Sequence, residues 1–323
     1  MTLTAGAASD ASASDASASL AVCESVYRPM RPVDLLSTVG MLRRGPNDPT
    51  MVHDGSTIWR ALRTPTGIAT LALRATGEGI RATAWGLGAA AALDTVPALC
   101  GAQDDDDGFD ASRHPVIAEA ARRNPGLHLT RTNQVFDALA CAIIEQKVTG
   151  LQAFGAWRYL VSRFGERAPG PTPRPMFATP QPSVWRFVPS WAWHKAGVEP
   201  PQSRTLVRAA ERGESIERAV TSAADGAASD RALTSLPGIG PWTSAETRIR
   251  ALGDPDAVSV GDFHLAHEVG FALTGSRTDD DGMLELLEPW SGQRQRVIRL
   301  IFASGVHEPR RGARLAPEDH RRR

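Results

Sequence analysis

The stretch Leu236–Glu246, LPGIGPWTSAE, places two glycines two residues apart, directly before a proline and a tryptophan. The preceding RALTS is typical of a helix end, and Pro241 suits the first turn of a following helix. Gly238 and Gly240 permit positive φ and carry no side chain, so the N–H groups of the turn can face outward. Together with the next helix N-terminus, these donors favour a site for one phosphate of a nucleic-acid backbone. A glycine turn that merely joins two helices is the alternative.

Length and composition indicate a globular protein of one large or two smaller domains. The chain has 323 residues, of which 42% are hydrophobic and 22% charged. Its 36 basic and 36 acidic residues cancel, so the total charge gives no support to a nucleic-acid partner, although a local patch is enough to bind one. Cys23, Cys100 and Cys141 are too far apart for a CxxC metal motif or a disulfide framework. This cysteine usage is typical of a reducing cytoplasm, where we expect the protein to act.

Four segments are expected along the chain. Residues 1–25 begin as Ala/Ser/Asp low complexity and predict a disordered tail without the features of a signal peptide. Residues 26–110 predict an α+β domain, 111–306 a helical region, and 307–323 a basic flexible tail. The acidic run DDDDGF (104–109) is interpreted as a solvated linker between the two domains. No later segment is long enough to span a bilayer, so no membrane partner is expected.

Hydrophobic periodicity predicts an α+β fold that is mostly α. Antiparallel strands are expected in STIWRALRT (56–64), GIATLALRAT (67–76) and GIRATAWG (79–86), and helices in the segments 32–45 and 88–101. The segments 132–146 and 151–165 have the helical period. APGPTPRPMFATPQP (168–182) is too rich in proline for a regular element and is expected to wrap over the surface.

Two further segments strengthen the interpretation of the glycine turn. AVSVGDFHLAHEVG places Asp262 at the start of a helix, after the turn, and AIIEQKVTGLQA (142–153) precedes both. Together the three segments resemble the helix–hairpin–helix DNA glycosylase superfamily, and most closely its alkylation-repair branch, 3-methyladenine DNA glycosylase II. The resemblance covers about residues 32–306. It implies a curved N-terminal antiparallel sheet with helices, followed by an all-α helix–hairpin–helix region.

The resemblance also implies a reaction. Members of this family flip a damaged nucleotide out of the duplex and hydrolyse its N-glycosidic bond. We therefore expect excision of alkylated, cationic purines such as 3-methyladenine in base excision repair. Asp262 matches the carboxylate that stabilises the oxocarbenium sugar and directs the attacking water. An aspartate before a helix is also a common N-cap, and one residue can serve both purposes.

Trp242 stands where bifunctional relatives such as endonuclease III carry a lysine that forms a Schiff base with the sugar. An indole cannot form this bond, so the resemblance implies a monofunctional enzyme. Trp242 would offer a flat face to the flipped cationic base, with a plain core tryptophan as the alternative. Glu246 lies one turn further along the helix and is a hypothetical second residue of the base pocket, with a solvated glutamate as the alternative.

Further contacts to damaged double-stranded DNA follow from the resemblance. Gln146 and Lys147 are expected at the tip of the loop that fills the gap left by the flipped base, although Lys147 departs from the leucine of the alkylation branch. The remaining expected DNA contacts are in the hairpin, at Gly238, Ile239, Gly240 and Thr243. The resemblance also implies a monovalent cation, Na⁺ or K⁺, at the hairpin carbonyls. No other cofactor is expected, and the protein is expected to be a monomer.

Other classes of protein were weighed against this one. His264, His267 and Glu268 have helical spacing that metal ligands could use, but DFHLAHE is not HExxH, so no metal held by side chains is expected. A non-catalytic DNA-binding scaffold gains nothing from a carboxylate beside a polyanion. That scaffold and a bifunctional glycosylase/lyase for other damaged bases remain open at this point.

Overall fold

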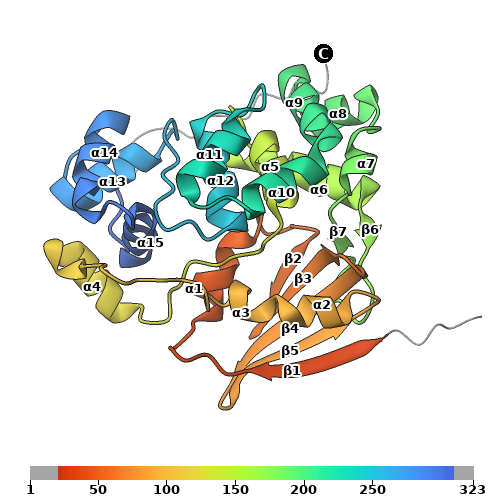
Figure 1. Cartoon of the computed structure of the whole chain (residues 1–323), viewed down its shortest axis with the longest axis horizontal. Helices are drawn as coiled ribbons and strands as arrows, with labels where there is room; N and C mark the ends of the chain where they lie inside the picture. The colour runs from red at the N-terminus through yellow and green to blue at the C-terminus, as the bar shows by residue number, and fades with distance from the viewer. Residues whose placement is uncertain (1–20, 309–323) are drawn as a thin grey trace, which may run out of the picture.

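The computed structural model describes residues 21–308, which form three packed units (Figure 1). The N-terminal unit contains β1 (Val22–Tyr27), α1 (Leu35–Val39), η1 (Gly40–Leu42), β2 (Met51–Asp54), β3 (Thr57–Thr64), β4 (Gly67–Thr76), β5 (Gly79–Trp85), α2 (Ala89–Asp94) and α3 (Val96–Leu99). The central unit contains α5 (Val135–Ile144), α6 (Gly150–Phe164), β6 (Glu166–Arg167), β7 (Phe177–Ala178), α7 (Pro182–Trp185), α8 (Ser190–Ala196), α9 (Pro200–Glu211), α10 (Gly213–Thr221), α11 (Gly226–Thr234) and α12 (Pro241–Ala251). The third unit contains η2 (Ala111–Arg113), α4 (Pro115–Arg123), α13 (Leu265–Thr274), α14 (Asp280–Leu287), η3 (Glu288–Trp290) and α15 (Arg294–Ser304).

The five-stranded sheet confirms the predicted antiparallel strands and extends them at both edges. Its order is β1-β5-β4-β3-β2, and β3, β4 and β5 occupy the three segments expected from the sequence. Alternate residues of β5, namely Ile80, Ala82 and Ala84, are buried, as expected for a sheet with one face on the core. Helices α1, α2 and α3 supply the other side of this core (Figure 1).

The two edge strands were not predicted. Residues 22–27 pair with β5, so the expected boundary of the tail after residue 25 is wrong, while residues 1–20 lie outside the described residues. β2 has only four residues, Met51–Asp54, which is too short to show a period of two. Both strands depend on partners distant in the sequence rather than on a local pattern.

The acidic run is an anchor rather than a solvated linker, which corrects the expectation for its first residue. Asp104 is buried, and its carboxylate accepts hydrogen bonds from Arg296 Nη2 (2.6 Å) and the Leu129 N–H (3.1 Å), and pairs with His128 Nδ1 (3.3 Å). Burial raises the pKa of Asp104, but the hydrogen bonds from His128 and Arg296 outweigh it and hold the pKa at about 2. The run therefore ties the N-terminal unit to α15.

The helical region holds two hydrophobic cores. Every residue of α5 except Asp137 is buried, and helices α6 to α11 pack around it. A separate core joins α4 to α13, α14 and α15. The proline-rich segment, expected on the surface, is in part internal, because Met176 and Ala178 are fully buried and β7 lies against β3.

The N-terminal unit contacts both helical units. Met41 of η1 packs against Ala245 and Ile249 of α12, and Arg299 of α15 donates a hydrogen bond to the carbonyl of Ser37 in α1. The N-terminal unit is therefore joined to the central unit through α12 and to the third unit through α15. Between residues 21 and 308, no helix combines the length and hydropathy that crossing a bilayer would need.

Candidate active site and nucleic-acid interface

The glycine hairpin joins α11 to α12 in a tight turn. The N–H of Ile239 donates to the carbonyl of Leu236 (3.0 Å), and Gly238 has a φ of +94°. A Cβ on Gly238 would lie 2.3 Å from Oγ1 of Thr205 in α9, so this position requires glycine for both conformation and space. Gly240 has a φ of −98°, so only Gly238 uses the positive φ that glycine permits at either position.

The turn presents backbone donors beside the first turn of α12. Within residues 21–308, the N–H groups of Gly238, Gly240 and Trp242 donate to no protein acceptor. Gly238 is exposed, and Pro241 occupies the first helical position. This arrangement of free N–H groups at a helix N-terminus suits an anion. Ile239 differs from its neighbours, because its side chain is buried in the central core and its N–H is used within the turn.

The loop between α5 and α6 is attached to the hairpin. Gln146 Nε2 donates to the carbonyl of Gly238 (3.0 Å) and to Oγ1 of the buried Thr243 (2.9 Å). Gln202 of α9 in turn donates to the carbonyl of Gln146 (2.8 Å). Lys147 at the loop tip is exposed and has a φ of +54°. The structure therefore brings Gln146 and Lys147 next to the hairpin, with Gln146 bound inward and Lys147 projecting outward.

Asp262 lies at the other side of the α12 N-terminus. Gly261, with a φ of +87°, reverses the chain just before it. Oδ1 of Asp262 accepts hydrogen bonds from the N–H groups of His264 (2.9 Å) and Leu265 (3.0 Å), so Asp262 caps the start of α13. Its Oδ2 accepts a hydrogen bond from Nε1 of Trp242 (3.0 Å). Both oxygens are thus held in fixed directions in a side chain that is only partly buried.

Trp242 and Glu246 point the same way from α12, but their environments differ. The indole of Trp242 is partly exposed and is oriented by Asp262. Glu246 forms an ion pair with Arg250 and accepts a hydrogen bond from Oγ of Ser259 (2.6 Å), so it is not a solvated glutamate. Burial raises the pKa of Glu246, yet Arg250 and Ser259 outweigh burial and keep the pKa below its ordinary value. Glu246 therefore stays ionised, with much of its charge already balanced by Arg250.

The three residues considered as metal ligands face different partners. His267 Nδ1 lies 3.0 Å from the carbonyl of Thr278, and Glu268 pairs with Nδ1 of His307 at 3.4 Å. The ring of His264 packs edge-on against Phe263. Across residues 21–308, no group of three His, Cys, Asp or Glu side chains could hold a metal ion.

Sequence reasoning missed two exposed apolar side chains beside these groups. Leu151, in the first turn of α6, is 72% exposed, and Phe263, next to Asp262, is 74% exposed. Single exposed apolar side chains are common on protein surfaces, so these two are of interest only because of where they stand. Their positions directly after the Gln146 loop and directly after Asp262 were the available signals.

The arrangement of the sheet and helices is similar to the fold of solved DNA glycosylase structures. The 3-methyladenine DNA-glycosylase from Archaeoglobus fulgidus superposes with a TM-score of 0.73 at 15% identity, covering 87% of this chain and 98% of that one. An 8-oxoguanine glycosylase/lyase from Clostridium acetobutylicum superposes with a TM-score of 0.68 at 11% identity, covering 88% and 98%. No protein-family profile and no curated protein matches the chain. At these identities the likeness establishes the fold, which agrees with the resemblance seen in the sequence.

Proposed function

We propose that this protein is a monofunctional DNA glycosylase that removes alkylated, cationic purines such as 3-methyladenine from duplex DNA. The observation that carries the proposal is the position of Asp262. Its carboxylate is fixed by three hydrogen bonds, remains partly exposed, and lies beside a hairpin that presents free N–H groups. The hairpin would bind a backbone phosphate, and the carboxylate would face the sugar of a flipped nucleotide.

The chemistry needs little more than this carboxylate. Flipping costs a few kcal/mol, and least where pairing is already weak. When the bond from C1′ to the base breaks, its electron pair leaves with the purine, which becomes neutral, and the sugar becomes an oxocarbenium ion. Asp262 stabilises that positive charge, and a water then attacks C1′ and transfers a proton to the Asp262 carboxylate. The product is an intact abasic site.

The lysine content supports the absence of a lyase step. The whole chain has two lysines, Lys147 and Lys195. Lys195 lies on α8, and its Nζ stands over the ring of Tyr159, 5.7 Å from the ring centroid. Lys147 lies on the α5–α6 loop. The position beside Asp262 is taken by the indole of Trp242, which cannot form a Schiff base.

We further infer that the protein acts as a monomer in the cytoplasm, in base excision repair. A monovalent cation at the hairpin stays part of the proposal, although three of the hairpin carbonyls, those of Leu236, Gly238 and Gly240, already accept hydrogen bonds. Binding of Na⁺ or K⁺ would therefore use other carbonyls of the turn.

The test is base release from methylated duplex DNA, with the released bases identified by mass spectrometry. Wild-type protein should release 3-methyladenine, and Asp262→Asn should slow release by about 10²–10³-fold, as expected for loss of a fixed charge stabiliser. Equal release by the variant would refute the role of Asp262. Borohydride trapping of a protein–DNA adduct would contradict the monofunctional assignment, and Lys147→Ala would then show whether that lysine is responsible.

A further inference from the structure

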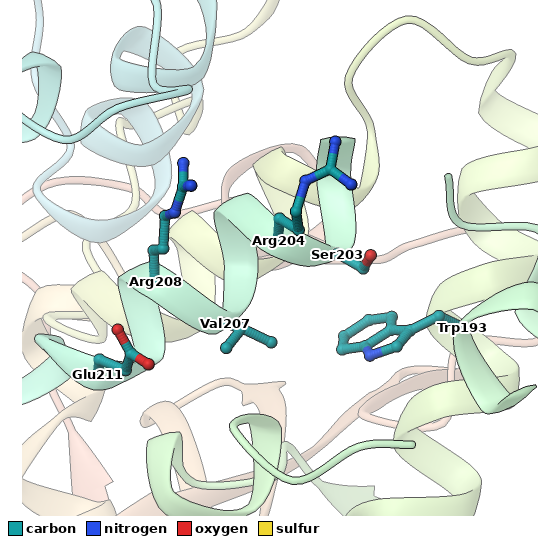
Figure 2. Close-up of a pocket in the computed structure, with 6 residues that line it drawn as sticks. All are labelled: Trp193, Ser203, Arg204, Val207, Arg208 and Glu211. Carbon is teal, nitrogen blue, oxygen red and sulfur yellow. The ribbon is translucent and has the colours of Figure 1, made fainter. Parts of the chain in front are cut away.

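A groove between α8 and α9 lies outside the chemistry described so far. Its volume is about 350 Å³. Trp193 of α8 lines one side, and Ser203, Arg204, Val207, Arg208 and Glu211 of α9 line the other (Figure 2). Trp193 is almost fully buried, and its Nε1 donates to the carbonyl of Val188, so the floor is rigid and apolar.

Arg204 and Arg208 of α9 extend from the same side of this groove. Figure 2 shows the guanidinium groups of Arg204 and Arg208 directed away from Trp193 and Val207. Both arginines are exposed, and within residues 21–308 neither has a carboxylate within ion-pair distance. Four residues of helix place their Cα atoms about 6 Å apart. Glu211, at the end of the groove, is also exposed and forms no ion pair with them.

Helix α9 contacts both candidate DNA-binding elements, the hairpin and the α5–α6 loop. Thr205, between the two arginines, is the residue against which Gly238 of the hairpin packs. Gln202, one turn earlier, holds the carbonyls of Ile144 (3.1 Å) and Gln146 (2.8 Å) at the start of the α5–α6 loop. The same helix therefore positions the hairpin and the loop, and carries the two unpaired cations beside them.

We propose that Arg204 and Arg208 bind phosphates of the duplex backbone next to the phosphate at the hairpin. The inference rests on the proposed function in taking DNA as the partner. A chain with equal numbers of acidic and basic residues needs local positive charge to attract a polyanion. The hairpin supplies only the partial charge of N–H groups and a helix N-terminus, whereas two guanidinium groups supply full charges in the geometry that phosphate oxygens accept.

The test measures affinity for an undamaged, fluorescently labelled duplex by anisotropy over a series of KCl concentrations. The logarithm of the association constant falls linearly with the logarithm of the salt concentration. Arg204→Gln with Arg208→Gln should make this fall less steep, by about 1 for each arginine that contacts a phosphate. Arg204→Lys with Arg208→Lys should keep most of the slope, because these substitutions keep both positive charges. The matched control is Arg74→Gln with Arg81→Gln, two exposed arginines that face each other across β4 and β5.

The outcomes separate this inference from the proposed function. If the Arg204/Arg208 variant has the same slope as wild type, the inference is overturned even if methylated bases are released. An equal reduction of the slope in the Arg74/Arg81 control variant would also overturn it. A reduced slope in a protein that releases no base would leave the surface as a DNA contact and remove the proposed reaction. Thermal melting of each variant shows that the fold is retained.

Discussion

At the scale of single residues, the hydrogen bond from Trp242 to Asp262 helps to orient the candidate catalytic carboxylate. It fixes Oδ2 of the carboxylate, while the start of α13 fixes Oδ1. A rigid carboxylate suits electrostatic stabilisation, because no reorganisation is needed when positive charge develops on the sugar. Trp242 therefore positions Asp262, in addition to any contact that its ring makes with the flipped base.

Trp242→Phe tests this positioning role. A hydrogen bond to a charged group contributes about 1.5–3 kcal/mol, so its loss should reduce base release by about tenfold or more. In the double variant with Asp262→Asn, the loss of the indole should add little, because its partner charge is already gone. Single-turnover rates of all four proteins measure this coupling. Full additivity would contradict it and would favour a role in base stacking alone.

Alanine substitutions at Gly238 and Gly240 should have different effects on stability. Gly238→Ala forces a Cβ against Thr205 at a φ of +94°, and should destabilise the protein by about 1–3 kcal/mol. Gly240→Ala meets nothing within 4 Å at an ordinary φ, and should change stability by less than about 0.5 kcal/mol. Its Cβ would nevertheless stand where a phosphate approaches, so affinity for DNA should fall. Urea unfolding and anisotropy on both variants measure the two effects.

At the scale of elements, the α5–α6 loop and the first turn of α6 each offer one candidate for the side chain that would fill the gap left in the DNA by a flipped base. Lys147 is exposed and charged, whereas Leu151 is exposed and apolar. Apolar side chains are the usual wedges between bases, because they replace the lost stacking surface. Under the proposed function, Leu151 is therefore the better candidate for the wedge, a choice that the sequence left open.

Leu151→Ala should reduce flipping, and Lys147→Ala should mainly reduce salt-dependent affinity. Fluorescence of 2-aminopurine placed beside the damaged base reports unstacking on binding. We expect the fluorescence increase to be lost with Leu151→Ala and kept with Lys147→Ala. The reverse pattern would return the wedge to Lys147.

At the scale of the whole molecule, the buried contacts of Asp104 connect the N-terminal unit to α15. Asp104→Asn should cost about 3–5 kcal/mol, because it leaves the buried Arg296 without its counter-charge. Asp106→Asn in the same acidic run removes only a surface pair with Arg31 and should cost less than about 1 kcal/mol. Comparable losses in urea unfolding would show that Asp104 is not an anchor.

Asp137 of α5 predicts a pH dependence at a different contact, beside Thr179 and Arg63. Asp137 keeps part of its surface exposed, but the protein around its carboxylate desolvates it and raises its pKa to about 6, despite a hydrogen bond from Thr179 and the nearby Arg63. Because the folded pKa lies above the unfolded one, its stabilising contribution is complete below about pH 4 and is lost as pH rises through about 6. Asp137→Asn should match wild type near pH 4 and exceed it by up to about 3 kcal/mol at pH 8. Unfolding free energies that differ equally at both pH values would contradict this.

The features that could be predicted from sequence are those set by local patterns. The alternation in 57–64 and 79–85 and the order of glycine, proline and aspartate are readable within a few residues. Strand β1, buried Asp104 and the Glu246–Arg250 pair were missed or misjudged. Strand β1 and Asp104 depend on distant partners in β5 and α15, whereas the Glu246–Arg250 pair is local, at i,i+4 spacing on α12, and was overlooked. The exposure of Leu151 likewise follows from packing rather than composition.

The bond from Arg299 to Ser37 has a consequence for how the protein is made. Its donor lies on α15, which leaves the ribosome after every other helix and strand that it joins. A nascent chain would carry Asp262 and the hairpin before this bond can form, so we expect the candidate site to become competent only after α15 has been synthesised. Stalled chains lacking residues 294–304 should be sensitive to protease and, under the proposed function, should release no damaged bases, so that incomplete chains would not leave abasic sites in DNA.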